Sequence, residues 1–213
     1  MAQNKKGIHA IISWPLVYNV FQWLAGASIY RKRMVRDFIK PFDSCRILDI
    51  GCGTGEYVAH IKKYCKNFEY HGFDSELSYI EHAKKMNAGN PRIHFYHQIL
   101  TEEMVTEFNQ FDIVIATALM HHLDDSEVTA LLKLALKCLK PGGRLVTYDP
   151  AKYEKMTFME KFFVKYDRGR SIRFEEEYLA LVKSVFPKSD KFSGHLTYYP
   201  ARSVVFECYH PAP

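Results

Sequence analysis

Hydrophobic residues along the chain occur in short continuous runs that alternate with stretches of helical spacing. The short runs predict strands at 46–50, 68–73, 92–96, 111–117 and 144–148, and the stretches between them predict helices at 56–66, 75–86, 101–108 and 126–139. Strands that alternate with helices pair in parallel, so this pattern predicts an α/β, doubly wound sheet. The ligand crevice is expected beyond the carboxyl ends of strands 46–50, 68–73 and 111–117.

The two ends of the chain carry further elements. An apolar stripe after Pro15 predicts a helix, and a second helix is expected over 28–40. After the fifth strand, helices are expected at 154–166 and 175–186, followed by strands at 191–198 and 203–209. These last two strands are expected to pair antiparallel.

Three local signals set element boundaries. The second helix is expected to stop before Pro41, because the residue before a proline avoids the helical region. Ser75 is expected to cap the helix that follows it. The tripeptide Pro141-Gly142-Gly143 predicts a turn before the fifth strand.

The composition is that of one globular domain. The chain has 213 residues, of which 47% are hydrophobic and 25% are charged, and its formal net charge is +5. The only basic cluster is Arg31-Lys32-Arg33 with Arg36, which is expected to form a solvated helix face. Nucleic acid is therefore not expected as a partner.

The cysteines and histidines do not form a disulfide or metal pattern. The five cysteines are an odd number without a Cys-x-x-Cys pair, and they are Cys45, Cys52, Cys65, Cys138 and Cys208. Such usage is typical of a reducing compartment, so a cytoplasmic location is expected. No metal site is expected, because the ten histidines also lack zinc spacing.

The amino-terminal stretch 8–30 is apolar and rich in aromatic residues. Polar residues and Pro15 interrupt it, so it predicts neither a signal peptide nor a membrane span. Its aromatic residues, followed by the basic cluster, leave open an alternative in which this helix makes a peripheral membrane contact.

A glycine-rich loop follows the first predicted strand. Residues 47–55 read Ile-Leu-Asp-Ile-Gly-Cys-Gly-Thr-Gly, with glycines at Gly51, Gly53 and Gly55. Such a loop lets backbone N–H groups approach a bound cofactor. The spacing is G-x-G-x-G, and Glu56 stands where a dinucleotide fingerprint has its third glycine. A nicotinamide dehydrogenase is therefore disfavoured.

This nonapeptide resembles the first motif of the class I S-adenosylmethionine-dependent methyltransferases. The resemblance implies a seven-stranded, mostly parallel sheet with an antiparallel last strand and helices on both faces. It implies an amino-terminal helical lid over residues 1–40 and an S-adenosylmethionine-binding domain over 41–213. It also implies that Gly51, Cys52, Gly53 and Gly55 contact the methionine part of the cofactor and that Asp49 is an orienting carboxylate.

Three further residues are expected to bind the nucleoside part of the cofactor. Asp74 ends the second strand, where an α/β cofactor site places the acid that binds a ribose, and the alternative is a helix-capping aspartate. After the third strand the family often has a Gly-Asp pair, whereas this chain has Gln98 and Ile99. Gln98 can accept the adenine hydrogen bond and Ile99 can lie against the ring, or Gln98 simply faces solvent.

The end of the fourth strand resembles the family's fourth motif with its trailing His-His-Leu. Ala116 is small and leaves room for the methionine arm. His121 and His122 follow just past the strand and are the candidates for a catalytic base, with His121 favoured because it is nearer the strand. The alternative is that one of them packs structurally. Lys140-Pro141-Gly142-Gly143 resembles the turn before strand five in the same family.

The acceptor is expected to be bound by lid and loop residues that the family motifs do not define. Arg168 and Arg170, with Arg173 close by, suit an anionic or glycan-like acceptor, and the alternative is a surface loop that pairs with nearby glutamates. In the lid helix, Tyr18 and Gln22 lie one turn apart and are expected to face the cofactor and the acceptor.

These features predict a methyltransferase that transfers a methyl group from S-adenosylmethionine to an oxygen or nitrogen of a small-molecule or glycan-like acceptor. The alternative is a non-catalytic cofactor-binding protein that docks a partner or a membrane through its aromatic amino-terminal helix. The oligomeric state is not predicted.

Overall fold

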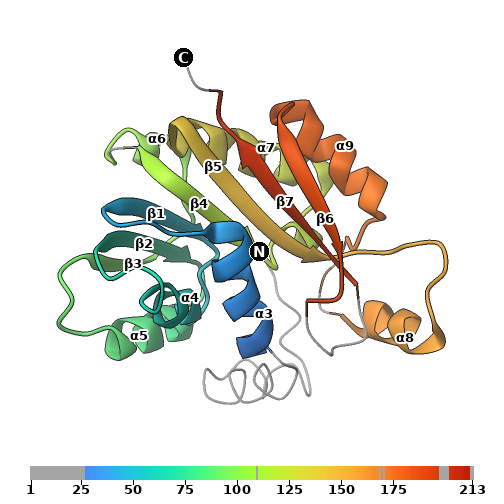
Figure 1. Cartoon of the computed structure of the whole chain (residues 1–213), viewed down its shortest axis with the longest axis horizontal. Coiled ribbons are helices and arrows are strands. Elements are labelled where there is room, and N and C mark those ends of the chain that lie inside the picture. Colours follow the sequence, from blue (N-terminus) through green and yellow to red (C-terminus); the bar gives the residue numbers. More distant parts are fainter. Residues whose placement is uncertain (1–26, 109, 168, 170, 197–201, 212–213) are drawn as a thin grey trace.

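A single mixed sheet of seven strands forms the centre of the molecule (Figure 1). The computed structural model describes residues 27–108, 110–167, 169, 171–196 and 202–211. The strand order is β3-β2-β1-β4-β5-β7-β6. The strands are β1 Cys45–Ile50, β2 Phe68–Asp74, β3 Ile93–His97, β4 Phe111–Thr117, β5 Leu139–Pro150, β6 Ser189–Gly194 and β7 Ser203–Tyr209.

Strand directions confirm the predicted topology. The neighbours among β1 to β5 pair in parallel. The last strand, β7, lies between β5 and β6 and runs antiparallel to both. The order of the strands reverses between β1 and β4, which is the switch point where open α/β sheets bind ligands.

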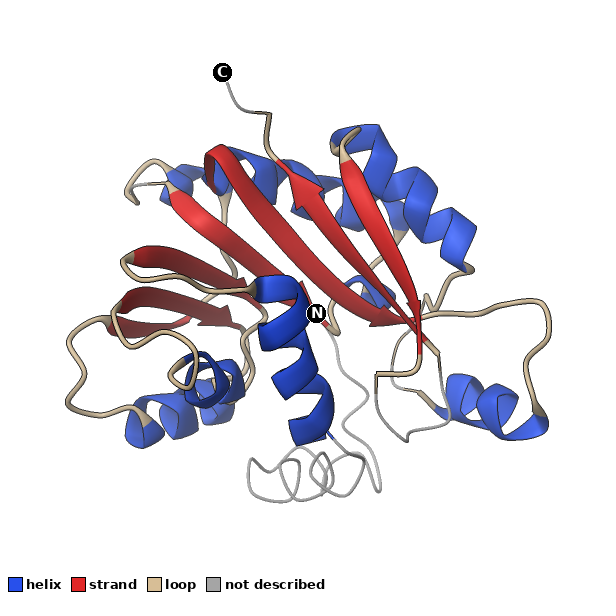
Figure 2. Cartoon of the chain, in the orientation of Figure 1, coloured by secondary structure: helices blue, strands red, loops and turns tan. Residues whose placement is uncertain are grey.

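Helices cover both faces of the sheet (Figure 2). The short π-helix η1, together with α4 and α5, covers one face, and α7 and α9 cover the other. The helical elements are α3 Ala27–Arg33, η1 Met34–Ile39, α4 Glu56–Ile61, α5 Leu77–Met86, α6 Glu102–Val105, η2 Met120–His122, α7 Asp125–Cys138, α8 Phe158–Tyr166 and α9 Glu175–Val185.

Two hydrophobic cores result, one on each face of the sheet. Successive side chains of a strand point to opposite faces, so neighbouring residues of β1 and β4 enter different cores. Ile47 and Ile113 pack on the side of η1, α4 and α5. Leu48 and Val114 pack on the side of α7 and α9. Central strands buried on both faces explain the continuous apolar runs in the sequence.

Some predicted boundaries are wrong. Helix α4 ends at Ile61 because the next turn tightens, with the N–H of Tyr64 bonded to the carbonyl of Ile61. The N-cap of α5 is Glu76, which makes no side-chain capping bond, so Ser75 is not the cap. The Pro141-Gly142-Gly143 segment lies inside β5, whose pairing with β4 shifts register there, and is not a separate turn.

The amino-terminal prediction falls mostly outside the described residues. Of the helix expected over 28–40, α3 and η1 form it as predicted, and Lys40 ends it in a left-handed conformation before Pro41. The lid residues up to 26 are not described. In the described part of the chain, no helix is long and apolar enough to cross a membrane.

Candidate functional site

The glycine loop turns back over the end of β2. The N–H groups of Gly51 and Cys52 both donate to the carbonyl of Phe73, at 2.8 and 3.0 Å. Gly53 has a φ of +54°, and a Cβ added there would meet nothing within 4 Å. Gly55 has a φ of +74°, and its Cβ would lie 2.8 Å from the ring of Phe95. The loop is therefore open at Gly53 and tightly packed at Gly55.

Asp74 joins this loop to the start of α5. Its Oδ2 accepts a hydrogen bond from the N–H of Gly53, and its Oδ1 accepts one from the N–H of Glu76, both at 2.9 Å. Burial raises the pKa of Asp74, and these backbone donors oppose the rise. The bond to Glu76 accords with the helix-capping alternative, and the bond to Gly53 places the carboxylate against the cofactor loop. The ribose role stays a prediction.

Asp49, in β1, carries a buried carboxyl group next to the same loop. The hydroxyl of Tyr70 donates to its Oδ2 at 2.5 Å, and its Oδ1 has no hydrogen-bond partner among the described residues. Burial raises the pKa of Asp49 to about 7, and the charge of Asp74 adds to the rise. The Tyr70 hydrogen bond and the charge of Arg31 act in the opposite direction.

The basic cluster was expected to form a solvated helix face, which holds for the exposed Lys32 and Arg36 but is wrong for Arg31. Only 8% of Arg31 is exposed, and one guanidinium nitrogen lies 4.0 Å from Oε2 of Glu56. Arg33 donates to two backbone carbonyls near the end of β6. The sequence held a signal for this burial, because Arg31 stands three and four residues before Met34 and Val35, on the apolar stripe of the helix.

Gln98 and Ile99 lie beside Asp74 at the edge of the sheet. His97 pairs with Asp74 across β2 and β3, so the next two residues follow directly beyond that pair. Both are exposed, and Ile99 exposes 54% of its surface. An exposed isoleucine at this edge is suitably placed for contact with an aromatic ring, and its contact with adenine stays a prediction.

The end of β4 is strained just beyond Ala116. Ala116 is fully buried in the core that faces α7. Ala118 has a φ of +53°, and its N–H donates to the carbonyl of Tyr148 at 2.6 Å. A non-glycine residue in this region costs about 1–2 kcal/mol. The side chain of Leu119, the next residue, lies beside Gly51. A Cβ added to Gly51 would be 3.5 Å from it.

His121 forms a pair with a buried aspartate that the sequence analysis missed. Its Nδ1 lies 2.7 Å from Oδ1 of Asp149, near the end of β5, and its backbone N–H donates to the same oxygen at 3.0 Å. Its Nε2 lies 3.5 Å from Oδ1 of Asp167. Asp149 is fully buried, and burial raises its pKa while His121 opposes the rise. An acid at the end of a buried strand next to β4 was the signal for Asp149.

The 171–173 segment closes over this pair. The N–H of Ser171 donates to the carbonyl of His121 at 2.9 Å, and a Cβ at Gly169 would overlap the imidazole ring. His121 is therefore 5% exposed. The ring of His122 lies beside that of His121, with centroids 4.0 Å apart, and His122 is partly exposed.

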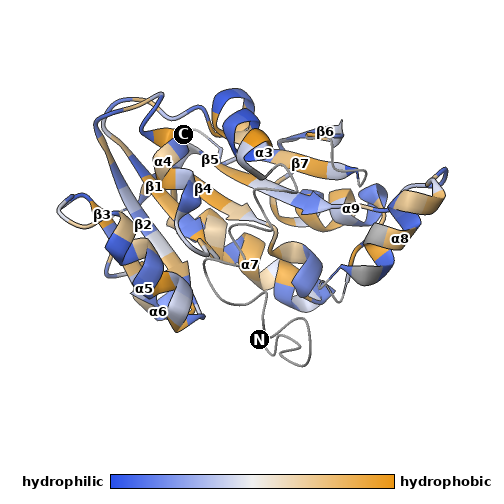
Figure 3. Cartoon of the chain, turned by 90° about the horizontal axis from the view of Figure 1, so that it is seen from below, coloured by the Kyte–Doolittle hydropathy of each residue, from blue (hydrophilic) through white to orange (hydrophobic). Residues whose placement is uncertain are grey.

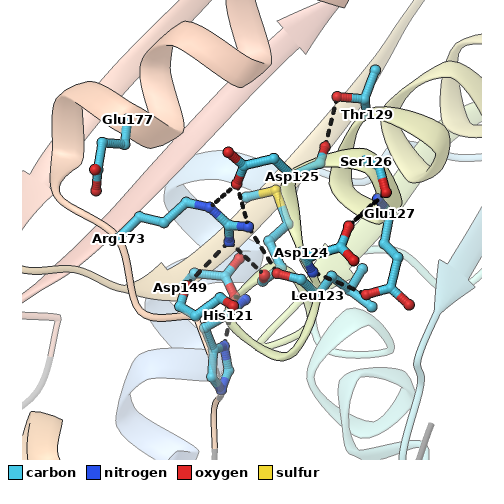
Figure 4. A network of polar contacts seen from close by, with 12 residues as sticks. His121, Leu123, Asp124, Asp125, Ser126, Glu127, Thr129, Asp149, Arg173 and Glu177 are labelled. Carbon is cyan, nitrogen blue, oxygen red and sulfur yellow. Dashed lines mark hydrogen bonds and ion pairs between the residues drawn. The ribbon is translucent and has the colours of Figure 1, made fainter.

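Arg173 holds the loop on both sides of His121 (Figure 4). Its guanidinium donates to the carbonyls of Met120 and Leu123 at 3.0 and 2.8 Å and pairs with Asp125 at 2.7 Å. Its donors are thus engaged by the protein, so the expectation that Arg173 contributes to acceptor binding is wrong. It borders an open hollow of about 600 Å³ at the start of α7.

The remaining predicted acceptor and lid residues, Tyr18, Gln22, Arg168 and Arg170, lie outside the described residues. In the described part of the chain, no three His, Cys, Asp or Glu side chains group as metal ligands. The structure thus brings together Asp49, the glycine loop and Asp74, and it places the His121–Asp149 pair at the same edge of the sheet.

Comparison with known proteins agrees with this arrangement. A family model described as a methyltransferase domain matches residues 47–143. A ubiquinone biosynthesis O-methyltransferase of Bartonella tribocorum is 30% identical over 105 residues, which cover 49% of this chain and 41% of that protein. A methyltransferase of Geobacillus sp. strain WCH70 is 32% identical over 145 residues, which cover 66% of this chain and 57% of that protein. The chain thus spans about half the length of these curated relatives.

Solved structures share the fold at low sequence identity. The S-adenosylmethionine-dependent methyltransferase SibL superposes with a TM-score of 0.69 at 14% identity, covering 92% of this chain and 57% of that one. The segment matched by the family model begins within β1 and ends within β5, so it includes the glycine loop, Asp74 and the switch point. Residues 47–143 therefore match a methyltransferase-domain family, and the described chain has the fold of the S-adenosylmethionine-dependent methyltransferases.

Proposed function

We propose that this protein transfers the methyl group of S-adenosylmethionine to an oxygen of a small-molecule acceptor, with His121 as the base that takes the hydroxyl proton. The observation that carries the proposal is the 2.7 Å contact between His121 and Asp149. It lies at the edge of the sheet that carries the glycine loop. A reduced cytoplasmic setting is part of the proposal, and it is supported by five free, buried cysteines.

The loop residues fit the cofactor. The side of Gly53 that a Cβ would fill is open, and Oδ1 of Asp49 is a buried acceptor without a partner among the described residues. In the proposal, the methionine part lies against the glycine loop and Asp49, the ribose against Asp74, and the adenine against Gln98 and Ile99. When bound, S-adenosylmethionine supplies an electrophilic methyl group on a sulfonium.

The protein contributes orientation and proton removal. Holding the reacting groups in line can lower the barrier by about 7–11 kcal/mol. The bond from Nδ1 to Asp149 fixes the imidazole and leaves Nε2 as the atom that accepts a proton. Nε2 points towards Asp167, so the acceptor hydroxyl must enter beside this residue.

An oxygen acceptor is favoured because a hydroxyl must lose its proton, which gives the His121–Asp149 pair a purpose. The name of the Bartonella relative, a ubiquinone biosynthesis O-methyltransferase, also supports a small-molecule hydroxyl. A glycan-like acceptor remains the alternative within this proposal. Arg168, Arg170, Tyr18 and Gln22 are proposed to line the acceptor side.

The test has a binding arm and a turnover arm. S-adenosylmethionine, and not NAD, should raise the melting temperature. With a mixed pool of phenolic and carboxylic acceptors, the protein should release S-adenosylhomocysteine, and His121→Gln should remove the release but keep the melting shift. Binding without release from any acceptor pool would instead support a non-catalytic cofactor-binding protein.

A further inference from the structure

Helix α8 exposes apolar side chains of the kind that a surface helix normally buries. It stands apart from the helices that cover the sheet (Figure 1). Phe158, Met159 and Phe162 expose 82%, 54% and 47% of their surfaces. Positions i, i+1 and i+4 share one side of a helix, so these residues form a single apolar face, here called the α8 face. Figure 3 shows orange, hydrophobic segments on this helix at the margin of the molecule.

The acidic residue of α8 faces the protein. Glu160 is 4% exposed, and it accepts hydrogen bonds from the N–H and hydroxyl of Thr157 and lies 3.3 Å from Nε2 of His195. This capping box fixes the rotation of the helix. Since the buried side is anchored by a carboxylate, the α8 face cannot turn inwards without breaking these bonds. The hydrogen bonds of Glu160 therefore keep the α8 face exposed.

The charges around the α8 face are mainly positive. Lys161 and Lys165 are exposed on the helix, and Lys155 is exposed just before it. The only exposed acid between residues 153 and 166 is Glu154. Phenylalanine and methionine bordered by lysines is the composition of helices that lie in a lipid headgroup layer.

We propose that the α8 face docks the protein on an anionic lipid surface. The apolar side chains enter the headgroup layer, and the three lysines pair with the lipid charge. Helix α8 follows β5, whose carboxyl end carries the Asp149 partner of His121. This inference does not depend on methyl transfer.

The test is sedimentation of the full chain with vesicles of equal parts phosphatidylglycerol and phosphatidylcholine. Phe158→Ser/Met159→Ser should lower the partition coefficient by about tenfold or more, without a change in melting temperature, because both side chains are exposed. The matched control is Leu77→Ser/Met86→Ser on α5, which removes two similarly exposed apolar residues and should leave binding unchanged.

The electrostatic arm uses Lys161→Glu/Lys165→Glu. This variant should also lose binding, and wild-type binding should weaken in pure phosphatidylcholine or in high salt. The proposal is overturned if the wild type does not sediment, if the α5 control loses as much binding as the α8 variant, or if the α8 variant changes only self-association in analytical ultracentrifugation. The last result would make a second copy of the chain the occupant of the α8 face.

Discussion

Nδ1 of His121 lies 2.7 Å from Oδ1 of Asp149, and the backbone N–H of His121 donates to the same oxygen. One buried carboxylate therefore fixes both the position of the residue and the orientation of its ring. In the proposed mechanism Nε2, which lies 3.5 Å from Oδ1 of Asp167, is the nitrogen that accepts the proton. The sequence placed His121 after β4, and its partner comes from β5, the neighbouring parallel strand.

The first prediction concerns this pair. Asp149→Asn should lower kcat by about 10²–10⁴-fold, because the imidazole loses the carboxylate that orients it and stabilises its charged form. The dissociation constant for S-adenosylhomocysteine, measured by calorimetry, should stay within about twofold. His82→Asn, on α5, is the control and should leave both unchanged. Full activity in Asp149→Asn would show that the pair is structural.

The second prediction separates two glycines of one loop. Gly55→Ala should lower the free energy of unfolding by about 2–4 kcal/mol, because its Cβ overlaps the ring of Phe95 and its φ is +74°. Gly53→Ala meets open space, so only the strain of its positive φ applies, about 1 kcal/mol. Denaturant titration measures both changes.

Cofactor binding should rank the two variants differently. If the open side of Gly53 receives the methionine part, Gly53→Ala should weaken S-adenosylhomocysteine binding by about tenfold or more, at little cost in stability. Unchanged affinity in Gly53→Ala, together with a stable fold, would remove this glycine from the cofactor site.

A third prediction follows from the buried carboxyl of Asp49, whose pKa rises from 3.8 to about 7. The folded protein holds this proton more tightly than the unfolded chain does. Its free energy of unfolding therefore falls as the pH rises from about 4 to about 7, by on the order of a few kcal/mol. Asp49→Asn removes this loss, so the melting temperature of the variant relative to wild type should increase between pH 5 and pH 8.

Exposed Glu81→Gln is the control for the pH experiment, and its melting temperature should follow the wild type at both pH values. Parallel profiles of Asp49→Asn and wild type would mean that Asp49 is ionised at both pH values.

The strands and the glycine loop were predictable because their signals are local. A continuous apolar run such as 111–117 reports burial on both faces of a strand, and the structure confirms β4 with these bounds. The glycine spacing after Ile50 likewise predicts a sharp turn, and the structure has positive φ at Gly51, Gly53 and Gly55.

Long-range contacts were not predictable in the same way. The burial of Arg31 depends on how α3 packs against α4, and the Asp149 partner of His121 depends on which strands are neighbours. A helix was expected over 154–166, but the exposure of the apolar residues of α8 depends on the rotation that the capping box at Thr157 and Glu160 sets. Such contacts between residues distant in sequence follow from the tertiary structure.

A fourth prediction concerns Arg173, which is 7% exposed. Arg173→Met should lower the free energy of unfolding by about 3–5 kcal/mol, because it removes the guanidinium donors from the buried carbonyls of Met120 and Leu123 and breaks the pair with Asp125. Since those two residues flank His121, turnover should fall as well. Denaturant titration and single-turnover kinetics measure the two effects.

The matched control is Lys137→Met, which removes a cation from an exposed pair with Glu102 and should change stability by at most about 0.5 kcal/mol. If Arg173→Met were as stable as this control but bound an anionic acceptor more weakly, Arg173 would be an acceptor-binding residue. If stability and turnover fall while acceptor KM stays constant, the guanidinium acts by holding the loop that presents His121.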